Sequence, residues 1–96
     1  MIQKTCPKTK DYCKVKFTVN AENAETVEIL GLNNDWETPR AMNRKKGGVF
    51  TYETTLPKNT QHEFRYRIDN AEWTNEPEAD EQRPNEFGSD NSVLHI

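Results

Sequence analysis

The sequence has little of several things that would point to a particular class of protein. Apolar residues make up only 32% of its 96 positions. No apolar run approaches the roughly 20 residues that a membrane-spanning helix needs. The first four residues, Met1-Ile2-Gln3-Lys4, lack the apolar stretch of a secretory signal peptide. These absences predict that the protein makes no contact with a membrane, and they favour a location in the cytoplasm.

Cysteine is scarce as well, and it does not form a metal-binding pattern. Cys6 and Cys13 are the only two cysteines, with no second pair and no histidine beside them. This spacing does not predict a zinc site. The acids Glu78, Asp80 and Asp90 lack the regular spacing of a calcium-binding loop. We therefore expect no metal and no cofactor. Because cytoplasmic thiols stay reduced, we expect Cys6 and Cys13 to be free, and a disulfide between them would require an oxidising compartment.

There is also no excess of positive charge. The net charge of −3 and the pI near 5.4 argue against a protein that neutralises nucleic-acid phosphates. Lysines concentrate in residues 1–16, and acids concentrate in residues 72–90. Charged residues make up 30% of the chain, a composition that raises the question of disorder. Against disorder, the apolar residues fall in regular alternating runs, so we predict a folded domain with two solvated surfaces of opposite charge.

The clearest of these runs is residues 63–73. Phe64, Tyr66 and Ile68 alternate with Arg65 and Arg67. A period of two indicates a β-strand with one buried face and one exposed face. Similar strands are predicted at residues 14–19, 26–30, 49–56 and 92–96, with a short edge strand from residue 41.

About seven short strands without an amphipathic helix predict an all-β protein, an immunoglobulin-like antiparallel β-sandwich. We expect residues 1–12 to be a flexible polar lead-in and residues 13–96 to be a single domain. Residues 74–91 contain Pro77 and Pro84 and read as a long polar loop. Connections of that length are commonly functional when they are ordered.

Two tryptophans, Trp36 and Trp73, are set among polar neighbours instead of apolar ones. Either ring could be a core residue at the rim of the sandwich. Alternatively, both rings could stack on the apolar face of a sugar. The sequence places asparagines nearby, and their amides both donate and accept hydrogen bonds, as sugar hydroxyls do. These asparagines are Asn33, Asn34, Asn75 and Asn91.

Three segments of the chain carry specific motifs. The first is Val27-Glu28-Ile29-Leu30-Gly31-Leu32-Asn33-Asn34-Asp35-Trp36. The second is Phe64-Arg65-Tyr66-Arg67-Ile68-Asp69, followed by Trp73. The third is Pro84-Asn85-Glu86-Phe87-Gly88-Ser89-Asp90-Asn91-Ser92-Val93. Together these segments resemble the family-48 carbohydrate-binding modules of glycogen branching enzymes, isoamylases and the AMP-activated kinase β subunit. The first is similar to the family's strand and "G-x-F-N-x-W" loop, and the third is close to the "P-N-x-F-G-x-x-N-S-V" run of branching-enzyme modules.

The resemblance implies a fold of the early-set type and a non-catalytic site for α-1,4-linked glucan, such as glycogen, starch or a maltooligosaccharide. It implies stacking by Trp36 and Trp73 and hydroxyl binding by Arg65 and Asn91. It also implies that Phe87 and Ser89 shape the edge of the site.

Two other functions remain open. The same surface could dock on an enzyme of glycogen metabolism or on a regulatory partner, with little affinity for sugar. Catalysis would need a nucleophile with a base, or paired carboxylates. His62 and His95 lie in predicted strands, with nothing to place a serine or a cysteine beside either one. We therefore expect that the protein is not an enzyme.

Overall fold

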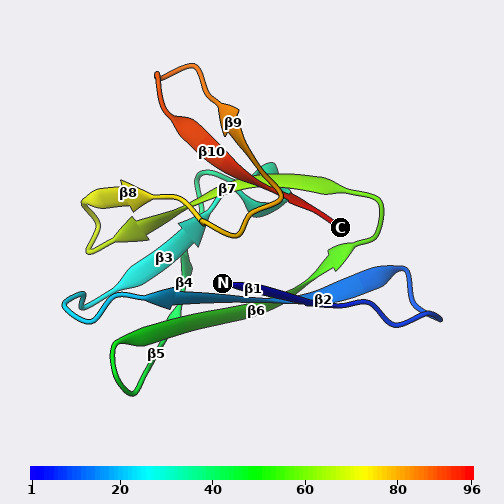
Figure 1. Cartoon of the computed structure of the whole chain (residues 1–96), viewed down its shortest axis with the longest axis horizontal. Coiled ribbons are helices and arrows are strands. Elements are labelled where there is room, and N and C mark those ends of the chain that lie inside the picture. Colours follow the sequence, from blue (N-terminus) through cyan, green and yellow to red (C-terminus); the bar gives the residue numbers. More distant parts are fainter.

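The computed structural model describes all 96 residues and shows two antiparallel sheets packed face to face (Figure 1). The first sheet has the strand order β1-β2-β6-β5, and the second has the order β4-β3-β7-β10-β9, with β8 also paired to β7. The prediction of an all-β sandwich is confirmed. The strands are β1 (Ile2–Thr5), β2 (Tyr12–Asn20), β3 (Val27–Leu30), β4 (Arg40–Ala41), β5 (Asn43–Lys45), β6 (Val49–Pro57), β7 (Gln61–Ile68), β8 (Glu72–Thr74), β9 (Glu81–Pro84) and β10 (Asp90–His95).

The chain has one helical element, the short 3₁₀ turn η1 (Leu32–Asn34) between β3 and β4. No helix in the structure has the length and apolar character needed to cross a membrane.

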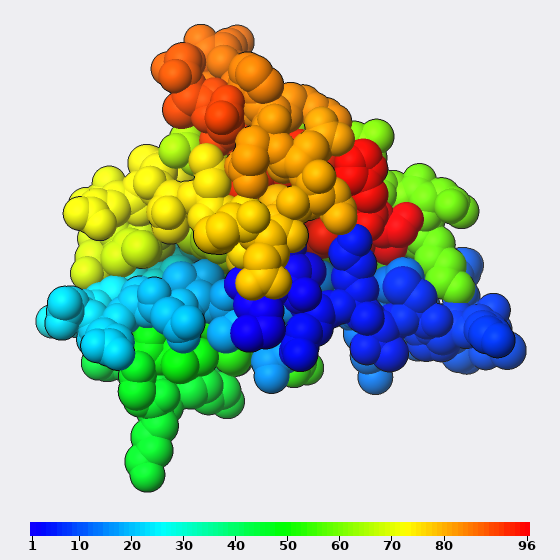
Figure 2. Space-filling model, in the orientation of Figure 1, coloured from blue at the N-terminus to red at the C-terminus, as the bar shows by residue number.

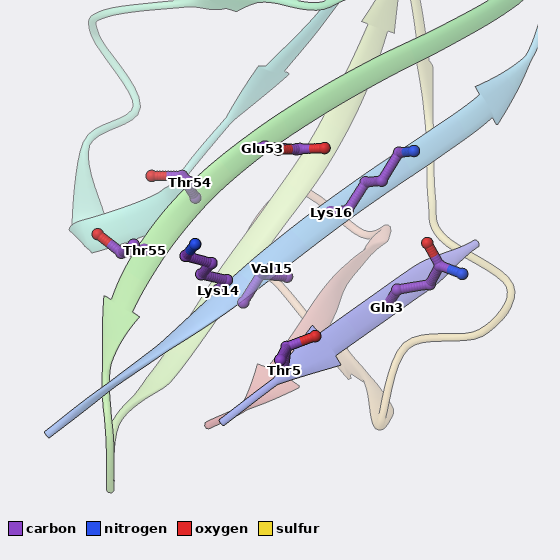
Figure 3. A pocket seen from close by; sticks show the side chains of 8 residues that line it. All are labelled: Gln3, Thr5, Lys14, Val15, Lys16, Glu53, Thr54 and Thr55. Atoms are coloured by element: carbon purple, nitrogen blue, oxygen red, sulfur yellow. The ribbon is translucent and has the colours of Figure 1, made fainter. Parts of the chain in front are cut away.

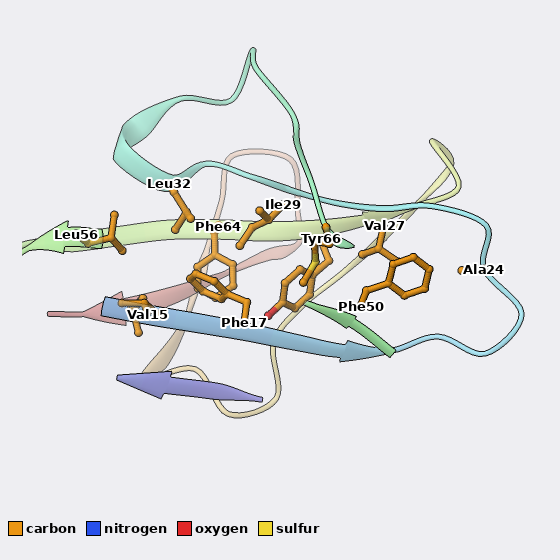
Figure 4. Packing of buried hydrophobic residues seen from close by; sticks show 12 residues of the cluster. Val15, Phe17, Ala24, Val27, Ile29, Leu32, Phe50, Leu56, Phe64 and Tyr66 are labelled. Carbon is orange, nitrogen blue, oxygen red and sulfur yellow. The ribbon is translucent and has the colours of Figure 1, made fainter. Parts of the chain in front are cut away.

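The core lies between the two sheets and follows the alternation in the sequence. Phe17 of β2 packs edge-on against Phe64 of β7, with ring centroids 5.3 Å apart (Figure 4). Phe64 packs in the same way against Tyr66, at 5.7 Å. Edge-to-face pairs contribute about 0.5–1.5 kcal/mol each beyond their burial. Because Phe64 and Tyr66 point inward, Arg65 and Arg67 lie on the outer face of the second sheet.

A buried carboxylate ties the connection after β8 to this core. Glu76 is 1% exposed and accepts hydrogen bonds from the Tyr66 hydroxyl and the Met1 amino group, each at 2.7 Å, and from the Glu78 N–H at 2.9 Å. Burial alone would raise the pKa of Glu76, but these hydrogen bonds outweigh it and lower the pKa. Glu76 therefore stays ionised. Burial, followed by the contact with Glu76, raises the pKa of Tyr66.

The expectation of a flexible lead-in over residues 1–12 is wrong for its first part. Ile2–Thr5 forms strand β1, which pairs with Phe17–Lys14 of β2. Lys4 Nζ donates to Asp80 Oδ2 at 3.1 Å and to the His95 carbonyl at 2.8 Å. This strand could not be predicted from an alternating pattern because Ile2 is its only apolar residue. Backbone pairing with β2 and the contacts of Lys4 stabilise it.

The expectation of free thiols is also wrong, because Cys6 and Cys13 form a disulfide that closes the β1–β2 hairpin. The pairing of β1 with β2 brings the two cysteines together. The disulfide was not predicted because residues 1–12 were expected to be flexible. Disulfides persist in oxidising compartments. The cysteines therefore give no support to a cytoplasmic location, which stays a prediction.

Residues 74–91 are not one long loop. They contain β9 and the first residues of β10, and these two strands pair from Asp90↔Pro84 to Val93↔Glu81. The β9–β10 hairpin projects from the body of the molecule (orange to red in Figure 2). Strand β9 has the sequence Glu-Gln-Arg-Pro, which carries no β-propensity, and it is stabilised as an edge strand by backbone pairing. With β1, β8 and β9 added, and with two short strands, β4 and β5, where one edge strand was expected, the structure has ten strands instead of about seven.

Candidate functional site

The outer face of the second sheet carries a hollow of about 670 Å³, hereafter the aromatic hollow. Its volume falls within the range of roughly 300–1,000 Å³ that small-molecule sites occupy. The structure brings five of the six site residues predicted from the sequence into its lining, and the sixth, Ser89, bonds to Arg65 beside it. The lining residues are Trp36, Arg65, Trp73, Asn85, Glu86, Phe87 and Asn91.

Trp73 lies on β8, directly opposite Arg67 of β7. The guanidinium carbons of Arg65 and Arg67 lie 5.4 and 5.5 Å from the centroid of its ring. Arg67 is itself fixed by two hydrogen bonds to Glu28 Oε1, at 2.8 and 3.1 Å. Cation–π contacts contribute about 0.5–1 kcal/mol at exposed sites. Trp73 is therefore held in place by cations and not by burial, and 44% of the residue stays exposed.

Trp36 follows η1 and is half-buried against Gly31. A Cβ atom on Gly31 would lie 2.4 Å from the Glu63 carbonyl oxygen and 2.7 Å from Cζ2 of Trp36. Gly31 also has a φ of 107°, which side chains rarely allow. Only glycine therefore permits both the bend after β3 and the position of this indole. Neither tryptophan is sealed inside the sandwich.

Local hydrogen bonds fix the segment that carries Trp36. Asp35 Oδ1 accepts from the N–H groups of Thr38 and Glu37, both at 3.1 Å. The hydrogen bond from Thr38 is the largest of the causes that shift the pKa of the Asp35 carboxyl, and together they lower it. The Gly31 N–H donates to the Asp35 carbonyl at 3.0 Å, which closes the turn. The Trp36 ring is thus presented on a hydrogen-bonded loop.

His62 supports the same segment from inside the sheet. Its Nδ1 accepts the Asn33 N–H at 3.1 Å, and its Nε2 lies 2.9 Å from Thr60 Oγ1. The Thr60 hydroxyl donates its proton to the Pro57 carbonyl at 2.6 Å, so Nε2–H of His62 must be the donor to Thr60. This arrangement requires the neutral imidazole, because a proton on Nδ1 would face the Asn33 N–H.

We expect the stability of the fold to fall as the pH drops below about 6.5, the pKa of a free histidine. Burial lowers the pKa of His62 in the folded protein. Between the two pKa values the unfolded chain binds a proton that the folded chain does not, so acid favours unfolding. This contribution is fully present above pH 6.5 and is lost as the pH falls toward the folded pKa.

Urea unfolding at a series of pH values between 5 and 7.5 measures this effect. His62→Asn is the control, because its amide oxygen can accept from Asn33 and does not titrate. The free energy of unfolding of the variant should change less over this range than that of the unaltered protein. Parallel curves would rule out a role for His62.

Asn85 organises the turn between β9 and β10. Its Oδ1 accepts from the N–H groups of Phe87 at 2.9 Å and Ser89 at 3.3 Å, and its Nδ2 donates to Asn91 Oδ1 at 3.1 Å. This turn holds Phe87 at the rim of the aromatic hollow, where the residue is 84% exposed. Our sequence reading missed Asn85 as a site residue. The signal was an asparagine two residues before Phe87, a spacing at which asparagine bonds its own backbone.

A chain of polar contacts crosses this face of the sheet from β9 to β10 by way of β7. Arg83 Nη1 lies 3.6 Å from Glu63 Oε2, and Glu63 Oε1 accepts from Asn91 Nδ2 at 3.2 Å. On the other side of Asn91, the series of hydrogen bonds continues through Asn85 to Ser89. The Ser89 hydroxyl accepts from Arg65 Nη1 at 3.3 Å. Asn91 and Arg65 are therefore positioned by their neighbours.

Arg65 keeps most of its hydrogen-bonding capacity. Its contact with Ser89 uses one of five N–H donors, and its buried Nε has no partner. The aromatic hollow therefore combines exposed aromatic faces with oriented donors and acceptors. It contains no nucleophile beside a base.

The sequence profile described as the glycogen recognition site of AMP-activated protein kinase matches residues 13–96. The chain belongs to this family. The match covers every residue of the aromatic hollow and leaves only residues 1–12, which include β1 and the turn that follows it, outside. The description of this family names glycogen recognition, which is a form of carbohydrate binding. A search of curated protein sequences finds no match for the chain.

Among solved structures, the fold of this family member is similar to part of an enterobactin esterase from Shigella flexneri. Structures of that esterase with 2,3-dihydroxy-N-benzoyl-serine and with 2,3-dihydroxy-N-benzoyl-glycine both match with a TM-score of 0.76. A structure of enterochelin esterase from the same organism matches at 0.74. Each comparison covers 99% of this chain at 13% identity, so it shows the fold alone. The chain spans about a third of those esterases, since it covers 32% of their length.

Elsewhere, the outer face of the first sheet carries a hollow of about 430 Å³ over β1, β2 and β6 (Figure 3). Lys14, Lys16, Glu53 and Thr55 line it, and it contains no aromatic ring. It offers hydrogen bonds but no platform for stacking. No group of three or more histidine, cysteine, aspartate or glutamate side chains in the chain is arranged to hold a metal ion.

Proposed function

We propose that the chain is a non-catalytic module that binds α-1,4-linked glucan, such as glycogen, starch or a maltooligosaccharide, in the aromatic hollow. The observation that carries this proposal is that Trp36 and Trp73, 37 residues apart in the chain, line one hollow together with Arg65 and Asn91. Family membership supports it, because the match extends through all four residues.

The chemistry of the hollow suits an uncharged sugar. The indole faces of Trp36 and Trp73 would stack on successive glucose rings, whose C–H faces are apolar. Arg65 and Asn91 would bond the hydroxyls at the ring edges, and Phe87 and Ser89 would shape the rim. Asn91 uses one Nδ2 proton on Glu63 and one Oδ1 lone pair for Asn85, which leaves one of each free.

The expected affinity is modest. If each indole removes on the order of 100 Å² of apolar surface from water, the gain is roughly 2.5 kcal/mol per ring at about 25 cal/mol/Å². Association costs about 4 kcal/mol or more in lost freedom of motion. Hydrogen bonds to hydroxyls add about 1 kcal/mol each. With three or four such bonds the balance is about 4–5 kcal/mol, which corresponds to a Kd of roughly a few tenths of a millimolar to a millimolar.

Two measurements test the proposal. Glycogen cast into a native gel should retard the protein relative to a gel without it. A chemical-shift titration with maltoheptaose should move the indole N–H signals of both Trp36 and Trp73, since both rings line the hollow. Absence of retardation together with unmoved indole signals would overturn glucan binding.

A second candidate is docking on another protein, and the observation that favours it is Phe87, which is 84% exposed at the tip of the β9–β10 hairpin. Large exposed apolar residues often mark protein contacts. The partner we propose is an enzyme of glycogen metabolism. In that case such an enzyme should broaden the signals of residues 85–89, and Phe87→Ser should prevent the broadening, while maltoheptaose leaves the indole signals unmoved.

A further inference from the structure

A second hollow of about 290 Å³ adjoins the aromatic hollow on the other side of Trp36, and we name it the polar hollow. The two hollows share Trp36 and Asn91 in their linings, so they lie next to each other. The other residues that line the polar hollow are Gly31, Asn34, Gln61, His62, Glu63 and Arg83.

The polar hollow differs from the aromatic hollow in its chemistry. Only one of its eight lining residues is hydrophobic, and that residue is Trp36. The side-chain oxygen Oε1 of Gln61 accepts from Arg83 Nη2 at 3.1 Å, which leaves the side-chain amide protons of Gln61 free to donate. Asn34 is exposed in the same lining, and its side-chain amide has no hydrogen-bond partner within the chain. The hollow therefore offers both donors and acceptors.

The Gln61 amide, the Arg83 guanidinium and the backbone of Asn34 are already held in position. Arg83 Nη2 donates to Glu81 Oε1 at 3.0 Å as well as to Gln61, and Arg83 Nη1 faces Glu63 at 3.6 Å. The Asn34 N–H donates to the Gly31 carbonyl at 3.0 Å, which fixes its backbone in the left-handed conformation with φ 60°. A ligand that enters this hollow orders few side chains, so it loses little of its binding free energy to ordering.

The charges in the hollow argue against an anionic ligand. Arg83 is the only cation in the lining, and Glu63 and Glu81 on either side of it neutralise its charge. Without a free positive charge, the hollow suits a neutral ligand with several hydroxyl groups.

We infer that the polar hollow is an additional subsite that takes a further glucose unit of a linear α-1,4-glucan as the chain continues past Trp36. This inference rests on the proposed function. In this arrangement Gln61 and Asn34 bond the hydroxyls of the added unit, and Asn91 bonds hydroxyls on both sides of Trp36. Affinity should therefore depend on the length of the oligosaccharide beyond the units that the tryptophan pair holds.

The test compares maltooligosaccharides of increasing length, from maltotriose to maltoheptaose, by calorimetry and chemical-shift titration. Gln61→Ala removes one donor, and Asn34→Gly removes the other without straining the positive φ of residue 34. Thr55→Ala on the first sheet is the matched control, because it also removes a polar side chain from an exposed strand position, far from both hollows.

The double variant Gln61→Ala, Asn34→Gly should bind maltoheptaose roughly tenfold more weakly and maltotriose equally well, since two hydrogen bonds contribute about 1–2 kcal/mol. The control should bind both as the unaltered protein does. If the double variant loses affinity for both sugars equally, or for neither, the subsite is overturned and the proposed function still stands. If the unaltered protein binds no glucan, the proposed function fails, and the subsite fails with it.

Discussion

Trp73→Ala should bind maltoheptaose roughly 70-fold more weakly than the unaltered protein and should lose its retention on glycogen. The change removes one of the two stacking platforms, which is about 2.5 kcal/mol of binding at roughly 100 Å² of apolar contact. Isothermal titration calorimetry and native gels containing glycogen measure the two effects. Equal affinity in the variant would exclude Trp73 from the site.

The fold should survive this substitution. Trp73 is 44% exposed on a three-residue strand, and its ring makes cation–π contacts with Arg65 and Arg67. Losing both cation–π contacts costs about 1–2 kcal/mol, a fraction of the 5–15 kcal/mol typical of a small domain. Trp73→Phe is the matched variant, because the smaller ring retains a stacking face and should bind with intermediate affinity. If Trp73→Ala unfolds, the indole is a structural residue instead of a binding one.

The parts of the fold that could be predicted from the sequence are those in which apolar side chains alternate. Phe64, Tyr66 and Ile68 reveal β7 because burial of one sheet face imposes a period of two. Strands β1 and β9 could not be found in this way, since their pairing depends on backbone groups that every residue possesses. The disulfide was missed for the same reason: Cys6 and Cys13 meet only after β1 has paired.

The candidate site shows a similar division. Trp36, Arg65, Trp73 and Asn91 could be selected because their side chains have the chemistry that a sugar needs, and the resemblance gave each a place. The residues that position these four side chains could not be selected from the sequence. Glu63 is a surface acid in the sequence, and only the geometry shows it between Asn91 and Arg83. A supporting residue acts through distance and direction, and neither can be read from residue type.

Gly31 belongs to this second group, and substituting it should affect both the fold and the site. We expect Gly31→Ala to lower the free energy of unfolding by about 3 kcal/mol and to weaken glucan binding. A φ of 107° costs an alanine roughly 1–3 kcal/mol, and relieving a crowded contact costs a similar amount. The added methyl would lie 2.4 Å from the Glu63 carbonyl oxygen, a backbone atom that moves only with β7. It would also lie 2.7 Å from Cζ2 of Trp36, so the indole must shift away from the position that the aromatic hollow requires.

Gly47→Ala separates these two causes. Gly47 also has a positive φ, 78°, but a Cβ atom there would meet nothing within 4 Å. This control therefore carries the backbone strain without the steric conflict, and it should lose only about 1 kcal/mol of stability and no affinity for maltoheptaose. Urea unfolding measures the stability of both variants, and the indole N–H signal of Trp36 should move in Gly31→Ala while that of Trp73 stays in place. If Gly31→Ala matches Gly47→Ala in stability and in binding, the Trp36 ring does not depend on Gly31. If Gly31→Ala loses more stability and more affinity than Gly47→Ala, then Gly31, a residue without a side chain, determines where the ring of Trp36 lies.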